Sequence, residues 1–236
     1  PTGKNLIGAF HHPRLVSADL TALCTLPAAE LSSGLGEVLK HALLLGEAEV
    51  AQLEAHAEAA RAGDPTLLQA LLRGCAAYKG KVVAADPEER DPQGGRMLLN
   101  LGHTVGHALE TASADTAAPL RHGEAVALGL LAMARVSARR FPDSPEARAL
   151  PERLLRLLPR LGLPTDLDRR LFTGAPGEPH TVAEAARAAL ALDKKRAGAT
   201  VRFIALRRPG DALPLALTIP ELWAALQEPA SRLEDL

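Results

Sequence analysis

Residues 96–110 place histidine, asparagine, arginine and glutamate side chains at helical spacing. If this segment is one helix, its polar residues lie three or four positions apart and share one face. These residues are Arg96, Asn100, His103, His107 and Glu110. The other positions are mostly apolar, so the helix is expected to be buried, where imidazole rings need polar partners. Two histidines at i and i+4 can both reach one ion, which predicts metal-dependent chemistry.

A catalytic zinc ion typically has three protein ligands and one open position, and two histidines with one glutamate are an established set. His103 is one candidate ligand, and His122 follows after a loop that can return it beside His103. Glu37 is the best candidate carboxylate, because it lies on a polar stripe of the helix expected at 28–45. Two such stripes are buried best when they face each other. The alternative for any one histidine is a hydrogen-bonded core residue.

His107 follows His103 by one helical turn and could be a fourth ligand or a general acid/base. A fourth protein ligand would close the metal site, so proton transfer or substrate binding is the preferred role. Gly102 and Gly106 lie in the same segment and each cost about 1 kcal/mol of helix propensity relative to alanine. Close approach of a backbone or a ligand would explain them, and ordinary tight helix packing explains them equally well.

The chain contains 21 arginines but six lysines, and the lysines form four small clusters. Lysine provides a compact ammonium where arginine provides a rigid fork, so these clusters are candidates for sites that need a point charge. Codon bias is an equally good explanation. Cations beside a metal predict a polyanionic substrate that carries phosphate, carboxylate or both. The candidates are Lys4, Lys40, Lys79, Arg96, Lys194 and Lys195, the last two with helix capping as the alternative.

Hydrophobic periodicity predicts a mainly α fold, a multi-helix metal- and substrate-binding domain with two N-terminal strands and a small C-terminal β-hairpin. The expected helices cover 27–45, 47–62, 65–85, 96–110, 122–140, 145–161, 166–172 and 182–195, with a last helix capped by Thr218 and Glu221. The expected strands cover 5–10, 14–19, 200–206 and 212–217. Two strands alone are marginal. We therefore interpret residues 1–20 as a remnant of an absent α/β domain and 21–236 as the helical domain.

Composition excludes several classes of protein. The 236 residues are 47% hydrophobic with a net charge of −1, so bulk charge predicts neither nucleic-acid nor membrane binding. No apolar run is long enough to span a bilayer. Two cysteines suggest no disulfide framework, which makes a reducing cytoplasm the expected location.

At the candidate metal and substrate residues named above, the chain resembles the 3-dehydroquinate synthases, which are sugar phosphate cyclases. The resemblance extends from Gly3 to about Leu206, in several ordered segments. They are Gly3–Phe10, Thr25–Pro27, Gly34–His41, Leu99–Glu110, His122–Gly129 and Asp193–Lys195.

The resemblance implies a role for each matched residue. Zn²⁺, with Co²⁺ as the alternative, would be held by Glu37, His103 and His122. NAD would be contacted by Thr25, Leu26 and Glu30. The substrate would be bound by Lys4, Asn5, Lys40, Lys79, Arg96, Asn100, His107 and one of Lys194 and Lys195. His107, Lys40 and Asn100 would be catalytic, and the protein would be a homodimer.

The family reaction converts 3-deoxy-arabino-heptulosonate 7-phosphate into 3-dehydroquinate and phosphate. It proceeds by transient oxidation with NAD, elimination of phosphate, reduction and an intramolecular aldol closure. The chain departs from the family pattern in three ways: a Gly-rich nucleotide-binding loop and two further substrate residues are absent, and the loop 87–95 is longer than the shortest family versions. We therefore expect the chain alone to be inactive.

Three alternatives remain open. One is another sugar phosphate cyclase such as 2-deoxy-scyllo-inosose synthase, whose glucose 6-phosphate substrate lacks a carboxylate; the number of cations favours a substrate with both anionic groups. The second is an iron-type alcohol or glycerol dehydrogenase. Glu37 argues against this alternative, because the metal ligands expected for that group are an aspartate and histidines. The third is a non-catalytic helical interaction domain.

Overall fold

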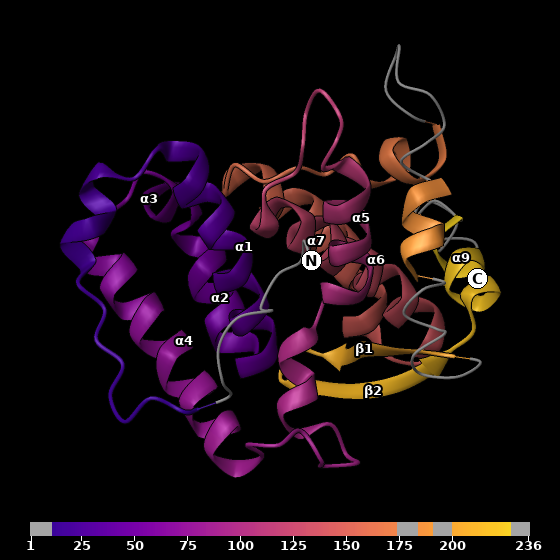
Figure 1. Ribbon diagram of the computed structural model, residues 1–236, viewed down its shortest axis with the longest axis horizontal. Coiled ribbons are helices and arrows are strands. Elements are labelled where there is room, and N and C mark those ends of the chain that lie inside the picture. The colour runs from indigo at the N-terminus through magenta and orange to yellow at the C-terminus, as the bar shows by residue number, and fades with distance from the viewer. Residues whose placement is uncertain (1–10, 174–183, 191–199, 228–236) are drawn as a thin grey trace.

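The computed structural model describes residues 11–173, 184–190 and 200–227, and most of its regular structure is helical (Figure 1). The elements are η1 (Leu20–Thr25), α1 (Ala28–Leu45), α2 (Glu47–Ala55), α3 (Ala57–Arg61), α4 (Pro65–Ala85), η2 (Gly95–Asn100), α5 (His103–Ser113), α6 (His122–Arg140), α7 (Pro145–Arg160), the π-helical turn η3 (Arg169–Thr173), β1 (Val201–Arg208), β2 (Asp211–Leu217) and α9 (Ile219–Gln227). Residues 184–190 are also helical. The predicted mainly α fold with a C-terminal hairpin is confirmed.

Helix α6 lies at the centre of the helical body, and α1, α5 and α7 pack against it (Figure 1). Every residue of α6 from Ala125 to Ala138 is buried. A helix that is buried around its whole circumference needs neighbours on all sides, and these three helices supply them together with β1 and α9. The elements that carry the site are therefore placed against one common frame.

Two helix starts follow the capping residues that the sequence predicts. The side chain of Asp64 accepts the backbone N–H of Leu67 at 2.8 Å and begins α4. Before α9, the Glu221 carboxylate accepts the Thr218 N–H at 2.7 Å and the Thr218 hydroxyl accepts the Glu221 N–H at 3.3 Å. Both arrangements satisfy N–H groups that have no partner inside the helix.

The two strands form an antiparallel hairpin whose register pairs Val201 with Leu217. Gly210, with φ +83°, provides the left-handed backbone in the turn. Pro214 lies in β2, where its missing N–H is tolerated because the strand is an edge. The buried hydroxyl of Ser137 accepts the Leu206 N–H at 3.0 Å and attaches the hairpin to α6.

The single helix predicted over 47–62 is wrong, because the chain bends at His56 between α2 and α3. The Nδ1 of His56 donates to the Gln52 carbonyl at 2.9 Å. That carbonyl would otherwise accept the backbone N–H of residue 56, so the side chain replaces a bond of the helix.

The strand predicted at 14–19 is also wrong, and the strand predicted at 5–10 lies outside the described residues. A strand needs a hydrogen-bonded neighbour, and residues 14–19 have none in the described part of the chain. Leu15 and Val16 are 82% and 76% exposed. An Asp19-capped 3₁₀ turn, η1, follows in place of further extended chain.

The two cysteines provide a test of how α4 packs. Cys75 lies on the side of α4 that packs against the core, and its burial raises the thiol pKa from 9.0 to about 11. Since the thiolate is the reactive form, we expect Cys75 to react with a thiol reagent at pH 8 roughly a hundredfold more slowly than a thiol of ordinary pKa. Exposed Cys24 is expected to react first. Mass spectrometry of partially labelled protein checks this, and equal labelling of both residues would contradict it.

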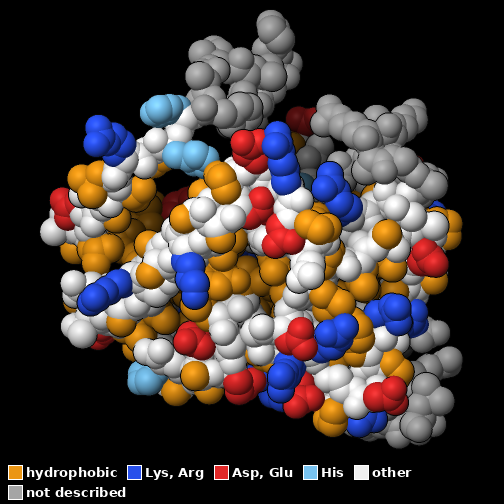
Figure 2. Space-filling view, turned by 90° about the horizontal axis from the view of Figure 1, so that it is seen from below, with side chains coloured by type: hydrophobic (Ala, Val, Ile, Leu, Met, Phe, Trp, Pro, Cys, Tyr) orange, Lys and Arg blue, Asp and Glu red, His pale blue; other side chains and the backbone are white. Residues whose placement is uncertain are grey.

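In the described part of the chain, no helix combines the length and the hydropathy that crossing a membrane requires. On the face drawn in Figure 2, Lys and Arg side chains are interspersed with Asp and Glu side chains. This distribution agrees with the net charge of −1.

Candidate metal and substrate site

Three residues from three helices converge on one point. Glu37 comes from α1, and His103 and His122 are the first residues of α5 and α6. The Nε2 atoms of His103 and His122 lie 3.3 Å and 3.2 Å from the same Glu37 oxygen, Oε1. The structure thus brings together the three side chains that the sequence nominated as metal ligands.

The other ring nitrogen of each histidine faces a group that can only accept a hydrogen bond. His103 Nδ1 donates to the Leu101 carbonyl at 3.1 Å, and His122 Nδ1 donates to the Glu110 carboxylate at 3.1 Å. In the neutral rings Nε2 therefore carries a lone pair, which points at the carboxylate of Glu37. The two Nε2 lone pairs and the Glu37 Oε1 atom would repel one another without a positive charge between them. Protons on the imidazole rings or a bound metal ion can supply that charge. This donor set fits zinc.

The polar stripe predicted on one continuous helix 96–110 is wrong in its first half. The chain is 3₁₀-helical to Asn100, Leu101 and Gly102 form a turn, and α5 begins only at His103. Gly102, between them, adopts φ +77° and presses against α6, where a Cβ on Gly129 would lie 1.8 Å from the Gly102 carbonyl oxygen. This break turns the Leu101 carbonyl toward the ring of His103, which an unbroken helix would not allow.

His107 lies on α5 one turn beyond His103 and is exposed, with ring centroids 5.0 Å apart. One ligating atom from each of His103, His107 and His122 can be chosen so that all three lie within 4.8 Å of one another. The geometry thus admits a second ligand set, made of three histidines. The division between a ligand His103 and a proton-transfer His107 stays a prediction.

The carboxylate of Glu37 also pairs with a buried cation. Lys40 Nζ lies 2.6 Å from Glu37 Oε2, and Lys40 is only 5% exposed. Burial acts to raise the pKa of Glu37. The hydrogen bond that His103 donates when its Nε2 carries a proton, together with the charge of Lys40, outweighs burial and holds that pKa well below its usual range. Glu37 is therefore ionised at neutral pH, as a metal ligand must be.

Close contact between α1 and α6 places Glu37 against His122. A Cβ on Gly123 would lie 1.7 Å from the Ser33 carbonyl oxygen, and a Cβ on Gly36 would lie 2.3 Å from the Gly123 carbonyl oxygen. The Gly123 N–H donates to the buried Ser33 hydroxyl at 3.1 Å. Sequence reasoning missed both glycines, although each directly adjoins a predicted ligand. It did single out Gly106, whose close neighbour is again backbone, the Ala125 carbonyl oxygen of α6.

For the remaining predicted site residues that the structure describes, it shows no side-chain hydrogen bond or ion pair with Glu37, His103 or His122. Asn100 and Lys79 are exposed at the end of η2 and on α4. Exposed Thr25 and Leu26 close η1, and Glu30, in the first turn of α1, accepts a bond from Arg121 Nε at 2.8 Å. Predicted substrate residues outside the described part of the chain are Lys4, Asn5, Lys194 and Lys195.

A buried carboxylate that sequence reasoning missed organises the loop before Arg96. Asp86 accepts backbone N–H groups from Arg90 at 2.8 Å and Arg96 at 3.0 Å. The guanidinium of Arg96 donates to the Pro87 carbonyl at 2.8 Å, so both ends of Arg96 are attached to this loop. An aspartate directly after a long helix and before a Pro- and Gly-rich loop was the available signal.

We expect Asp86→Ala to remove the hydrogen-exchange protection of the Arg90 and Arg96 amides, because their acceptor is lost. Glu88→Ala, which removes an exposed carboxylate of the same loop, should leave that protection unchanged. These backbone bonds lower the pKa of Asp86 from 3.8. Its contribution is therefore complete above that value and is lost as the pH falls through the lower folded-state pKa. Protection that is independent of Asp86 would contradict this account.

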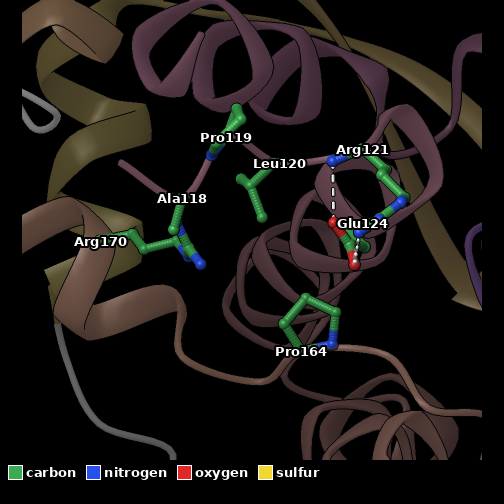
Figure 3. A pocket seen from close by; sticks show the side chains of 7 residues that line it. All are labelled: Ala118, Pro119, Leu120, Arg121, Glu124, Pro164 and Arg170. Atoms are coloured by element: carbon green, nitrogen blue, oxygen red, sulfur yellow. Dashed lines mark hydrogen bonds and ion pairs between the residues drawn. The ribbon is translucent and has the colours of Figure 1, made fainter. Parts of the chain in front are cut away.

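A separate pocket of about 570 Å³ opens beside the start of α6 (Figure 3). Its lining includes Arg121, Glu124 and Arg170, but none of the converging residues Glu37, His103 and His122. Arg121 is paired with Glu124 and Arg170 with Asp166. Because its charged groups already have partners, we assign the pocket no role.

Residues 34–196 match the family model described as the C-terminal part of 3-dehydroquinate synthase. The chain belongs to the 3-dehydroquinate synthase family. The match includes Glu37, His103 and His122, and the resemblance inferred from the sequence is confirmed. A 3-dehydroquinate synthase of Halorhodospira halophila is 42% identical over 222 residues, which cover 94% of this chain and 57% of the relative. The chain thus spans just over half the length of that relative.

Solved structures of related cyclases share the fold. A 2-deoxy-scyllo-inosose synthase, complexed with carbaglucose-6-phosphate, NAD⁺ and Co²⁺, superposes with a TM-score of 0.71 at 24% identity, covering 96% of this chain and 60% of that one. A 2-epi-5-epi-valiolone synthase of Streptomyces hygroscopicus, with NAD⁺ and Zn²⁺ bound, superposes with a TM-score of 0.66 at 27% identity, covering 98% and 59%.

Proposed function

We propose that the chain is the metal- and substrate-binding part of a 3-dehydroquinate synthase, a phosphate-eliminating lyase of aromatic amino acid biosynthesis. The reaction would convert 3-deoxy-arabino-heptulosonate 7-phosphate into 3-dehydroquinate and phosphate. The observation that carries the proposal is the convergence of Glu37, His103 and His122, with buried Lys40 beside them, inside the segment that matches the family.

Glu37, His103 and His122 would hold the metal ion, Zn²⁺ or Co²⁺, whose contribution is to polarise the hydroxyl that is oxidised. Thr25, Leu26 and Glu30 would contact NAD, which supplies the hydride acceptor and donor. The exposure of these three residues leaves them accessible to a cofactor. The related valiolone synthase binds the same two groups, which supports this assignment.

The chain's own side chains would bind and orient the substrate and move its protons. Lys40 provides an ammonium fixed by its 2.6 Å contact with Glu37. His107, exposed beside His103, would transfer protons, and Asn100 would hold a substrate hydroxyl. Anionic groups of the substrate would be bound by Lys4, Asn5, Lys79, Arg96, Lys194 and Lys195. Fixed cations and a positioned base suit a reaction sequence that is completed at one site.

The alternative cyclase, 2-deoxy-scyllo-inosose synthase, differs from a 3-dehydroquinate synthase in its substrate, which lacks a carboxylate. The 42% identity to a 3-dehydroquinate synthase exceeds the 24% identity to a 2-deoxy-scyllo-inosose synthase, and it favours the acid phosphate substrate. We also propose a cytoplasmic homodimer, on family membership alone. Because the chain spans 57% of its relative, we propose that turnover needs the part of the fold found in the remainder.

The experiment joins the 236 residues to the preceding part of the Halorhodospira halophila relative and assays the chimera with NAD and Zn²⁺. We expect phosphate and dehydroquinate to form from 3-deoxy-arabino-heptulosonate 7-phosphate, and the 236-residue chain alone to be inactive. Lys40→Ala in the chimera should lower kcat by about a hundredfold or more. Preference for glucose 6-phosphate would replace the proposal with the alternative cyclase.

A further inference from the structure

Glu110, in the last turn of α5, contacts one of the two histidines that converge on Glu37. Its Oε2 lies 3.1 Å from His122 Nδ1, and its side chain is 19% exposed. Glu110 follows His103 by seven residues, which is two helical turns, so both face the same side of α5. One helix thus supplies a proposed ligand and the residue that holds a second ligand.

Two hydrogen bonds hold the backbone directly before His122. The buried Leu120 N–H donates to the Ser113 hydroxyl at 3.0 Å, and the Arg121 N–H donates to Glu124 at 2.8 Å. These bonds fix the backbone on which His122 is carried. They do not fix the rotation of its ring, and Glu110 is the side chain in contact with Nδ1.

We propose that Glu110 is a positioning residue for the metal site. By accepting the Nδ1–H of His122, it orients the ring and selects the tautomer whose Nε2 faces Glu37 at 3.2 Å. A carboxylate in this position also raises the basicity of the ligating nitrogen. The corresponding acceptor for His103 is a backbone carbonyl, so the Glu110 contact is the one that substitution can remove. This inference rests on the proposed metal site.

The test measures the Zn²⁺ dissociation constant of the 236-residue chain by competition with a chelator. We expect Glu110→Ala to weaken zinc binding about 10- to 100-fold. Glu110→Gln should have a smaller effect, because its amide oxygen still accepts the bond without the charge. Glu152→Gln, which removes an exposed carboxylate of α7, is the matched control and should bind like the wild type.

A second measurement separates positioning from a general loss of structure. In the zinc-loaded wild type, nuclear magnetic resonance should show a slowly exchanging His122 Nδ1–H proton, and Glu110→Ala should lose it. If Glu110→Ala does not fold, Glu110→Leu, which fills similar space but cannot accept the hydrogen bond, decides. Zinc affinity within about twofold of wild type and an unchanged Nδ1–H signal in that variant would overturn the inference.

The same titration distinguishes this inference from the proposed function. His122→Ala and Glu37→Ala should each abolish tight zinc binding. If they do so while the Glu110 variants bind normally, the positioning role fails and the metal site stands. If neither of them affects zinc binding, both the metal site and the role of Glu110 fail.

Discussion

Replacing Glu37 with alanine is expected to weaken zinc binding by about a hundredfold or more, because it removes the carboxylate that both histidine Nε2 atoms face. The same change leaves the ammonium of Lys40 buried without its 2.6 Å partner, which is expected to lower the free energy of unfolding by about 3 kcal/mol. Zinc affinity by chelator competition and denaturant unfolding measure the two effects separately.

A double variant distinguishes metal loss from instability. Glu37→Ala combined with Lys40→Met removes the unpaired charge, so stability should recover while zinc affinity stays low. His107→Ala is the second control and should retain zinc affinity. Our assignment gives His107 a role in proton transfer, not in metal binding. Retained affinity in Glu37→Ala together with lost affinity in His107→Ala would instead select the three-histidine ligand set.

Gly123→Ala is expected to lower the free energy of unfolding by about 3 kcal/mol or more, because α1 must move away from α6 to admit a methyl group. The new carbon would lie 1.7 Å from the Ser33 carbonyl oxygen, which is backbone and cannot rotate away. Since the same contact holds Glu37 against His122, zinc affinity should fall as well. Equilibrium unfolding in denaturant measures the change through the midpoint at constant slope.

Gly34→Ala is the matched control for this prediction, because Gly34 lies in α1 two residues before Gly36 and a Cβ there meets nothing within 4 Å. Relief of the glycine entropy should make that variant more stable by up to about 1 kcal/mol. Equal stability of Gly123→Ala and the wild type would show that the crossing of α1 and α6 is looser than described.

Most helices could be predicted from the sequence, because their signals are local. The Asp64 cap, Pro65 at the first helical position and the capping box of Thr218 are each read within a few residues. The break at Gly102 could not be read in this way. The polar spacing continues across it, and the contact that decides it is with Gly129 on another helix.

In the candidate site too, residues with local sequence signals could be predicted, and residues that depend on contacts between distant elements could not. Glu37, His103 and His122 could be nominated because each belongs to a helix with a polar stripe or begins one. Asp86 and the Glu110 contact with His122 depend on how loops close, which periodicity does not report. The three converging residues were therefore predictable, and the residues that contact and surround them became visible only in three dimensions.

Anomalous diffraction at the zinc edge from zinc-loaded crystals of the chain tests the central assignment most directly. We predict one peak bonded to a Glu37 oxygen and to Nε2 of His103 and His122 at about 2.0–2.2 Å, with His107 not bonded to it. A peak ligated by His103, His107 and His122 without Glu37, or no peak among these residues, would contradict the account.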